Sequence, residues 1–404
     1  MLRRPLFPSE WSSIPLSPSN LTLANTLPVG QSFLWHRLPL QSFVTNIDPT
    51  LPTEEYSRAI DNPPRVVCLR QSAARIYYTA IYPDTVSPNF DKDNSITNRW
   101  INDYFQLERF PDLEALYLKW RNQDPYLFGR IELHDKSTGV RVLRQDPWEC
   151  LIAFITSTNN HIPRITSLLH RFSQAFSEPL LSLEHPLGLG AVIYHLFPPP
   201  HRLPSTTLES TLREIGFGYR ASFIESSLQS LRNTFGTLEG GIEAGLEKWR
   251  AADITEVRNN LMALKGVGRK VADCVMLMCL DKPSVIPIDT HVANIAARYP
   301  SFPSRLKSKN MSKQWYDETQ VFLEKQWGFQ MGGWCQAVMF AADLSKPILR
   351  IKKEAKVEAI LKESNESKTT VLEARKPVLE VTELPLLKRT RSQSRQETSS
   401  TKRR

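Results

Sequence analysis

The segment LMALKGVGRKVADC, residues 261–274, decides the fold of this chain. Apolar residues on both sides recur at helical spacing, whereas Gly266 and Gly268 lie between them, where the backbone must turn sharply. The pattern predicts two helices joined by a tight glycine hairpin. The second helix then begins with free N–H groups around Gly266, Gly268 and Val271, which can hold a phosphate without a side chain. An ordinary packing corner is the alternative interpretation, because a lone Gly-x-Gly is a weak signal.

Two candidate reactive side chains follow the hairpin turn. Lys270 stands at the start of the second helix, and the segment PIDTH places Asp289 nineteen residues later. An amine is nucleophilic only when it is uncharged, so a catalytic lysine needs burial or a nearby cation that favours loss of its proton. The Asp289 carboxylate can stabilise a developing positive charge and can also cap the helix that starts at Thr290. A surface lysine that binds phosphate in a non-enzymatic hairpin is the alternative.

The N-terminal part has the composition of a β-sheet. Four short segments contain β-branched and aromatic residues between polar breaks and predict antiparallel strands: NLTLAN (20–25), QSFLWHRL (31–38), RVVCLRQ (65–71) and RIYYTAIY (75–82). The polar segment 84–95 predicts an exposed insertion.

From Asp146-Pro147 onward the pattern becomes helical, since proline suits a first helical turn and apolar residues follow at helical spacing. Further helices are predicted at Ile162–Phe176, Tyr219–Thr234, Glu256–Leu264, Val271–Leu280, Thr290–Tyr299, Lys313–Lys325 and Gly333–Leu344. The fold class is therefore α+β, with an N-terminal antiparallel sheet domain (12–140), a mainly α-helical helix-hairpin-helix domain (141–346) and a disordered basic tail (347–404).

The charge of the chain indicates a polyanionic partner. The 404 residues carry a net charge of +9, and the last 54 residues contribute 14 Lys and Arg against 8 Glu, or +6 of that total. The remainder is only +3, so binding by the folded part must depend on where its charges lie. The KRTR segment and the terminal KRR in the tail are typical of a nuclear-import signal or a non-specific DNA contact, with a solvated charge run as the alternative.

Composition also excludes several classes of protein. Five cysteines without a CxxC pair indicate no disulfide framework, and no His/Cys cluster has zinc or iron–sulfur spacing, so we expect no metal. The longest uncharged run is interrupted by prolines, so no membrane segment is expected. We expect a monomer without an organic cofactor, located in the nucleus, with a mitochondrial presequence in MLRRPLFPSEWSS as a weaker alternative.

GVGRKVADC and IPIDTHV resemble the helix-hairpin-helix DNA glycosylases with a Gly/Pro-rich loop and a terminal Asp, specifically the eukaryotic 8-oxoguanine DNA glycosylase/AP lyases. Four further stretches agree in order: LPVGQSFLWH (27–36), VLRQDPWECLIAFITSTNNHIPRI (142–165), GFGYRASFI (216–224) and GGWCQAVMFAADL (332–344). The resemblance implies a base-excision repair enzyme that removes 8-oxoguanine opposite cytosine from damaged duplex DNA. By the same resemblance, Lys270 attacks the sugar C1′ and forms a Schiff base, β-elimination follows, and Asp289 is the electrostatic partner.

The resemblance also assigns binding residues. Gly30 would offer its carbonyl to the N7 hydrogen of 8-oxoguanine, Phe340 and Cys274 would sandwich the ring, and Gln336 would face its pairing edge. On the DNA side, Asn159 would fill the void left by the extruded base and Tyr219 would wedge the stack. Arg164 and Arg220 would read the orphaned cytosine, and Gly266, Gly268, Val271 and His291 would contact phosphate. Plain core packing is the alternative for Phe340 and Cys274, and a helix-start histidine is the alternative for His291.

Two positions depart from the family pattern. Lys265 stands where a proline is expected, which leaves the hairpin less rigid, and His161 stands where another asparagine is usual. The alternative functions are an alkylated-base glycosylase of the same fold, for which Lys270 has no use, and a non-catalytic DNA-damage binding protein. Members with an iron–sulfur cluster are disfavoured because the four-cysteine set is missing.

Overall fold

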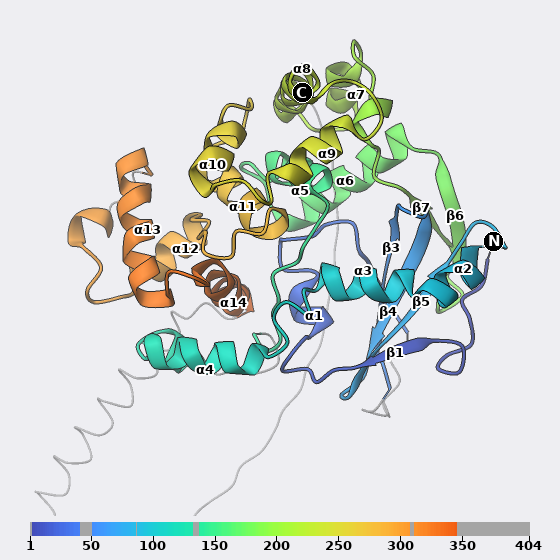
Figure 1. Ribbon diagram of the computed structural model, residues 1–404, viewed down its shortest axis with the longest axis horizontal. Helices are drawn as coiled ribbons and strands as arrows, with labels where there is room; N and C mark the ends of the chain where they lie inside the picture. The colour runs from blue at the N-terminus through green and yellow to red at the C-terminus, as the bar shows by residue number, and fades with distance from the viewer. Residues whose placement is uncertain (1, 41–50, 86, 132–136, 308–310, 346–404) are drawn as a thin grey trace, which may run out of the picture. The chain divides into compact units, whose positions relative to one another are not determined.

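Figure 1 shows the computed structural model of the chain, which describes residues 2–40, 51–85, 87–131, 137–307 and 311–345. These ranges belong to one compact unit, Met1–Pro347. The predicted basic tail lies outside the described residues. Within the described ranges, no helix combines the length and apolar character needed to cross a membrane.

A five-stranded antiparallel sheet forms the N-terminal part, in the order β1-β5-β4-β3-β2. Its strands are β1 Ser12–Pro15, β2 His36–Pro39, β3 Glu54–Ile60, β4 Arg65–Gln71 and β5 Arg75–Ile81. The two predicted strands at 65–71 and 75–82 are confirmed and pair with each other, with Val67 opposite Ala80. The predicted strand at 31–38 is confirmed only at its end, where β2 begins at His36.

The central strand β4 is apolar on both faces because both faces are covered. Val67 and Leu69 share a hydrophobic cluster with the helix α3, Ile96–Tyr104, which lies across the sheet (Figure 1). Val66 and Cys68 share another cluster with a two-stranded hairpin, β6 Pro179–Glu184 and β7 Ala191–His195. A strand covered on both sides therefore reads as a continuous apolar run.

One N-terminal prediction, the strand at 20–25, is wrong, whereas the described residues of 84–95 are mostly exposed as predicted but also form a helix. The segment 20–25 is not a strand, because Leu23–Thr26 forms the short helix α1, where Leu23 accepts the Leu27 amide through its carbonyl. The predicted exposed insertion contains the helix α2, Ser87–Asn94. Asp84 accepts the Ser87 amide at 2.7 Å, and the Tyr82 hydroxyl donates to the buried Asp91 at 2.8 Å. Tertiary contacts thus stabilise a polar helix that lacks an apolar face.

The C-terminal part is helical and its centre is α5, Pro147–Thr156, which is buried along its whole length. Asp146 caps this helix by accepting the Glu149 amide at 2.8 Å, and Pro147 occupies the first turn as predicted. The other helices of this part are α6 Ile162–Phe176, α7 Leu208–Glu214, α8 Arg220–Phe235, α9 Gly241–Lys248, α10 Ile254–Met262, α11 Arg269–Cys279, α12 Thr290–Ala296, α13 Lys313–Trp327 and α14 Gly332–Ser345, whereas α4, Leu113–Gln123, belongs to the N-terminal part. Short 3₁₀ turns occur at Phe128–Arg130, Pro200–Arg202 and Ser304–Lys307.

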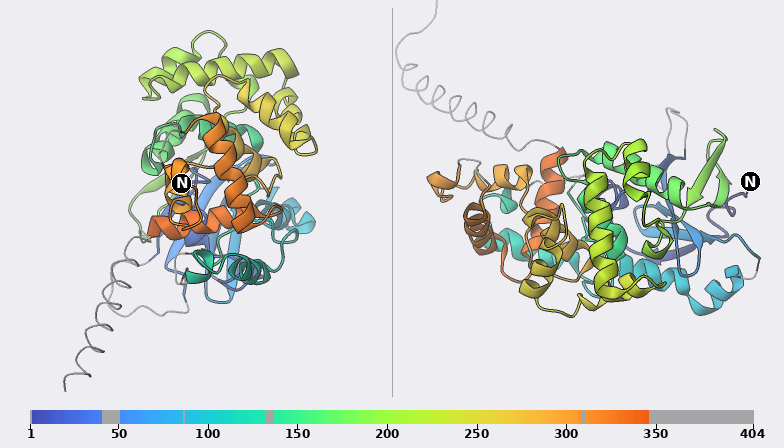
Figure 2. Two further views of the ribbon diagram at one scale, coloured as in Figure 1. Left: turned by 90° about the vertical axis from the view of Figure 1, so that its left-hand side faces the viewer. Right: turned by 90° about the horizontal axis from the view of Figure 1, so that it is seen from above.

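The two predicted domains share a hydrophobic core. Phe33, Tyr117 and Trp120 from the N-terminal part pack in one cluster with the helices α5, α11 and α14. Helices α13 and α14, coloured orange to brown in Figure 2, lie side by side. The helix that carries the glycine hairpin is therefore held from several sides, which fixes where its first turn points.

Candidate active site

The predicted glycine hairpin is confirmed between α10 and α11. Gly266 has φ +83°, and a Cβ there would lie 2.4 Å from the Phe223 ring of α8, so both conformation and space require glycine. Gly268 has ordinary backbone angles, and a Cβ there would have no neighbour within 4 Å. The N-terminus of α11, whose first amides have no intrahelical acceptor, therefore opens onto free space. Ser227 donates its hydroxyl to the Lys265 carbonyl at 3.0 Å, so the hairpin is tied without the expected proline.

Lys270 lies in the first turn of α11 and is half-buried. Its Nζ is 5.3 Å from the centroid of the Phe154 ring of α5, and it interacts with the buried Cys274 one turn further on. Burial raises the pKa of the Cys274 thiol to about 11, although Lys270 itself lowers it and Asp289 raises it further. At neutral pH Cys274 is therefore a thiol, so an ammonium–thiolate pair, which the sequence left open, is disfavoured.

Asp289 caps α12, as the sequence predicts. Its Oδ1 accepts the amides of His291 at 2.9 Å and Val292 at 3.0 Å, which fixes the orientation of the carboxylate. The charge of Asp289 and the amine of Lys270 both act on Cys274, so the three groups lie together. An amine and a carboxylate therefore both lie within electrostatic range of the Cys274 thiol.

The structure brings together Gly30 and Phe340, two of the residues predicted to contact the base, from opposite ends of the described chain. Gly30 has φ +84°, and a Cβ there would lie 3.0 Å from Ile162 Cδ1 and 3.9 Å from the Phe340 ring. Phe340 is half-buried and meets the His291 ring edge-to-face at 5.5 Å. Gln336 precedes Phe340 by one turn of α14 and is 95% buried, yet its Oε1 has no hydrogen-bond partner among the described residues. A buried, unpartnered amide beside an aromatic ring suits recognition of a planar polar ligand.

The predicted DNA residues divide into exposed and buried groups. Asn159 is exposed with φ +47° in the turn after α5, Tyr219 is 45% exposed, and Arg164 is exposed at the start of α6. Arg220, in contrast, is buried: its guanidinium donates to the carbonyls of Thr158 and of Asn159, the latter at 2.8 Å. It also stacks on the Tyr219 ring at 4.6 Å. In the free protein Arg220 therefore holds the turn that presents Asn159.

His161 has a local role that explains its departure from the family pattern. It is the N-cap of α6, and its Nδ1 accepts the Arg164 amide at 3.4 Å. An imidazole nitrogen therefore does the capping work that an asparagine oxygen does elsewhere. His291 is half-exposed beside Asp343, with 3.5 Å between its Nδ1 and the carboxylate, and this accessibility is compatible with a phosphate contact.

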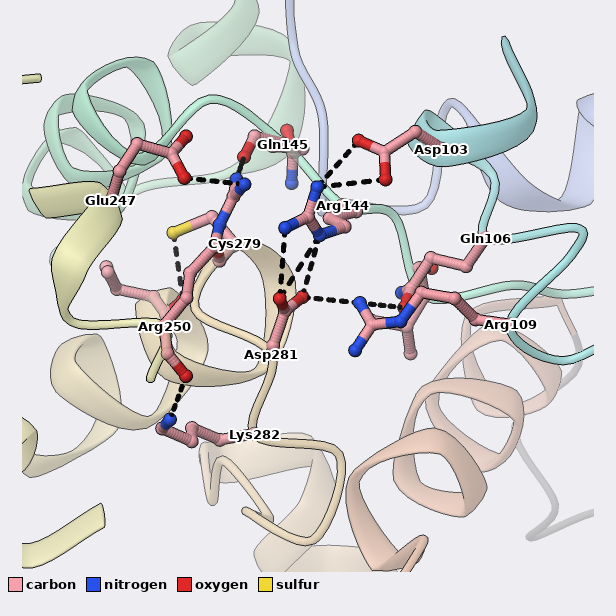
Figure 3. A network of polar contacts seen from close by, with 12 residues as sticks. Asp103, Gln106, Arg109, Arg144, Gln145, Glu247, Arg250, Cys279, Asp281 and Lys282 are labelled. Atoms are coloured by element: carbon pink, nitrogen blue, oxygen red, sulfur yellow. Dashed lines mark hydrogen bonds and ion pairs between the residues drawn. The ribbon is translucent and has the colours of Figure 1, made fainter. Parts of the chain in front are cut away.

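Sequence reasoning missed the polar network that holds the C-terminal end of α11. Figure 3 shows Arg144 between Asp103 and Asp281, with Arg109 bonded to Asp281 as well. Asp281 has φ +59° immediately after α11 ends, and Arg144 donates to it from Nε at 2.9 Å. Single charges in a loop give no signal of pairing, because the partners are far away in the sequence.

A second network lies on α11 beside Lys270. Asp273 is fully buried and accepts from Arg258 of α10, Arg269 of α11 and Tyr316 of α13. Removing one partner of such a buried network would leave an uncompensated buried charge, so its members depend on one another. The i,i+4 spacing of Arg269 and Asp273 was the one signal available in the sequence.

Among the described residues, no group of three or more His, Cys, Asp or Glu side chains is arranged to hold a metal ion.

Comparisons with known proteins find relatives that span most of the chain. The family model for the N-terminal domain of 8-oxoguanine DNA glycosylase matches residues 13–151. The chain is 31% identical over 360 residues to an N-glycosylase/DNA lyase of Saccharomyces cerevisiae, covering 83% of this chain and 86% of the yeast protein. It is 32% identical over 359 residues to N-glycosylase/DNA lyase OGG1 of Arabidopsis thaliana, covering 86% and 87% of the two chains. A crystal structure of the Clostridium acetobutylicum 8-oxoguanine glycosylase/lyase, bound to double-stranded DNA with cytosine opposite 8-oxoguanine, superposes with a TM-score of 0.60 at 26% identity, covering 81% and 92%.

Proposed function

This chain belongs to the N-glycosylase/DNA lyase family, and from that premise we propose that it excises 8-oxoguanine opposite cytosine and then cleaves the abasic site. The observation that carries the proposal is the placement of Lys270 beside Asp289 at the open N-terminus of α11. A glycosylase that acts through water has no need of such an amine. A lyase needs it to form an imine.

The excision step follows from the two groups. Lys270 Nζ attacks C1′ of the damaged nucleotide, the N-glycosidic bond breaks, and the base leaves with the electron pair of that bond. Positive charge develops on the sugar as the bond breaks, and the Asp289 carboxylate stabilises it. Opening of the sugar ring then gives a protonated imine between Lys270 and C1′.

The lyase step uses the same imine. Because the imine withdraws electrons, the C2′ proton becomes acidic, and its removal breaks the bond between C3′ and the 3′ phosphate oxygen. The phosphate leaves next to the amides of Gly266, Gly268 and Val271, where a helix N-terminus stabilises an anion. One lysine therefore supports both the glycosylase and the lyase reactions.

Base selection is assigned to Gly30, Gln336, Phe340 and Cys274. The Gly30 carbonyl accepts the N7 hydrogen that 8-oxoguanine has and guanine lacks, and Gln336 uses its unpartnered amide on the pairing edge. Phe340 and the neutral Cys274 thiol hold the ring between them. An acceptor left unpaired by guanine costs about 1–3 kcal/mol, which is enough to discriminate between the two bases.

The target base has to leave the duplex before it can reach Lys270. We assign Asn159 to the vacated space, Tyr219 to the adjacent stack and Arg164 with Arg220 to the orphaned cytosine. Arg220 can read that base only if it exchanges its bonds to Thr158 and Asn159 for bonds to cytosine. Cytosine recognition is therefore coupled to movement of the Asn159 turn. His291 adds a phosphate contact, and the protein acts as a monomer on duplex DNA.

Release of free 8-oxoguanine from a duplex tests the function. The wild-type protein is expected to release the base from a duplex with cytosine opposite, and more slowly with adenine opposite, while Lys270→Ala releases none. Lys265→Ala is the matched control, because Lys265 is a second lysine of the hairpin and is exposed. This variant is expected to release the base as the wild type does. Release by Lys270→Ala at the wild-type rate would contradict the proposal.

The basic tail supports a nuclear location for the enzyme. Its last 17 residues, from Lys388, carry KRTR and KRR without acidic residues other than one Glu. Deleting 388–404 from a fluorescent fusion is expected to move the protein out of the nucleus and leave the salt dependence of DNA binding unchanged. An unchanged nuclear signal with a shallower salt slope would instead assign the tail to DNA contact.

A further inference from the structure

The Asp273 network connects the two catalytic groups through α13. Asp273 follows Lys270 by one helical turn, and its carboxylate accepts the Tyr316 hydroxyl at 2.9 Å. The same hydroxyl accepts the Ile288 amide at 2.8 Å. Ile288 is followed directly by Asp289. Two hydrogen bonds and one peptide bond therefore join the turn that carries Lys270 to the carboxylate beside it.

The members of this connection are shielded from water. Asp273 and Ile288 are 0% and 1% exposed, and Tyr316 is 5% exposed. Arg258 and Arg269 donate to the Asp273 carboxylate from Nε at 2.9 and 3.2 Å, so that the carboxylate has donors from three helices. Burial and the charge of Asp273 raise the pKa of Tyr316 well above its ordinary value. The hydroxyl hence keeps its proton and its two bonds over the working pH range.

The loop between α11 and Asp289 is pinned at both ends. At its start, Lys282 donates its amide to the Met276 carbonyl at 3.1 Å, and the Pro283 carbonyl accepts the Gly333 amide at 3.0 Å. Its last residue, Ile288, is held by the Tyr316 hydroxyl. Loss of that hydroxyl would leave a buried N–H without an acceptor at the position next to Asp289.

We propose that Tyr316, oriented by Asp273, is a positioning residue that sets the separation between Lys270 and Asp289. The inference rests on the proposed function of these two groups. Its physical basis is that rates of reactions between held groups fall steeply when the groups shift by about 1 Å. Tyr316 is buried, and we assign it no contact with the DNA or with the reacting atoms.

Tyr316→Phe removes only the hydroxyl, and Tyr299→Phe is its matched control. The Tyr299 hydroxyl is also buried, donates to the buried carboxylate of Asp124 and accepts the Trp327 indole N–H at 2.8 Å. Both variants therefore lose the same kinds of bond and should show similar falls in melting temperature. Because the control loses a similar amount of stability, a slower reaction in Tyr316→Phe alone would reflect positioning of the reacting groups and not a loss of folding.

The test compares single-turnover excision with DNA affinity. The excision rate is measured at saturating enzyme on a duplex with 8-oxoguanine opposite cytosine, below the melting range of both variants. Affinity is measured for a duplex with a tetrahydrofuran abasic analogue. Tyr316→Phe is expected to slow excision on the order of tenfold with affinity unchanged, whereas Tyr299→Phe keeps both at the wild-type level.

Hydrogen exchange gives a second readout that does not depend on activity. Peptides covering 283–292 should exchange faster in Tyr316→Phe than in the wild type and Tyr299→Phe. Wild-type excision and exchange rates in Tyr316→Phe, or an equal loss of excision rate in the two variants, would overturn the inference. An inactive wild-type enzyme, or one that excises without Lys270, would instead contradict the proposed function.

Discussion

Gln336 is a residue that we expect to lower the stability of the free protein and to strengthen binding of the damaged base. Its Oε1 is buried without a partner among the described residues. A buried amide group in that state costs about 1–3 kcal/mol. A residue kept at this cost is expected to serve the ligand rather than the fold.

Replacing Gln336 by methionine tests this account. Gln336→Met should leave the melting temperature unchanged or raise it, because no hydrogen bond of Oε1 is lost. It should lower kcat/KM for 8-oxoguanine excision by roughly 10- to 100-fold, since the base loses a polar partner. Thermal unfolding and excision kinetics measure the two effects.

Gln31 is the control for this substitution. Its side chain is equally buried but donates to the carbonyls of Thr26 and Arg141 and accepts the Leu143 amide. Gln31→Met should therefore lose more than about 2 kcal/mol of stability. An equal loss of stability in both variants would show that Gln336 is an ordinary structural residue.

At the residue scale, residues that stand in a sequence motif could be predicted, whereas contacts between residues far apart in the sequence could not. Lys270 and Asp289 stand in the motifs GVGRKVADC and IPIDTHV, and their assignment follows from the resemblance that these motifs carry. The burial of Arg220 was not predictable, because it depends on carbonyls of Thr158 and Asn159, some sixty residues away in the sequence. The roles of Asp273 and Tyr316 were hidden for the same reason.

The two glycines of the hairpin between α10 and α11 differ in their surroundings. At Gly266 the backbone has φ +83° and the Phe223 ring occupies the place of a side chain. At Gly268 the backbone is ordinary and the space is empty. The fold therefore requires glycine at position 266 but not at position 268, where we propose that the open space admits the DNA backbone.

Alanine at each position should give opposite results. Gly266→Ala should lose roughly 2 kcal/mol or more of unfolding free energy, because strain and overlap add. Gly268→Ala should change it by less than about 1 kcal/mol and yet weaken DNA affinity about tenfold, because a methyl group stands where the phosphate backbone approaches. Urea unfolding and fluorescence anisotropy measure the pair. If Gly268→Ala bound DNA as tightly as the wild type, the DNA backbone would not approach the protein at Gly268.

Secondary structure was predictable where local signals and burial agree. The predicted helix Ile162–Phe176 has the bounds of α6, since a cap, a proline and an apolar face coincide there. Strand β3 was missed because it contains Glu55 and Arg58, whose charges suggest solvent. In the structure Glu55 pairs with Arg4 and Arg70, and Arg58 pairs with Glu149 of α5 at 2.5 Å. Such buried pairs become visible only when distant elements meet.

At the scale of the whole molecule, two histidines join the sheet to the helical part. His36 of β2 and His170 of α6 lie with ring centroids 4.5 Å apart. Burial lowers the pKa of His36 to about 4, and burial with the neighbouring His36, Arg58 and His195 lowers the pKa of His170 to about 3. Both rings are therefore neutral in the folded protein at neutral pH.

These two rings predict that acid weakens the fold. An unfolded histidine titrates near pH 6.5, so below that pH the unfolded chain binds protons that the folded chain does not. The stabilising effect is complete above about pH 6.5 and is lost as the pH falls toward 4, by roughly 1 kcal/mol per pH unit for each histidine. Urea unfolding at several pH values should show this slope.

The slope should become shallower in His170→Gln, because one of the two buried neutral rings is then missing. An equal slope in His170→Gln and wild type would mean that other groups cause the acid sensitivity. This pair could not be predicted, because 134 positions separate the two rings along the chain.

The central claim is that Lys270 forms a covalent imine with damaged DNA, and borohydride trapping tests it most directly. The protein is incubated with a duplex that contains 8-oxoguanine opposite cytosine in the presence of borohydride, which reduces the imine to a stable amine. The adduct is then digested and mapped by mass spectrometry. We predict a single DNA-linked peptide with the added mass on Lys270, and no adduct with Lys270→Ala. An adduct on another residue, such as Lys265, or equal trapping by Lys270→Ala would contradict the account.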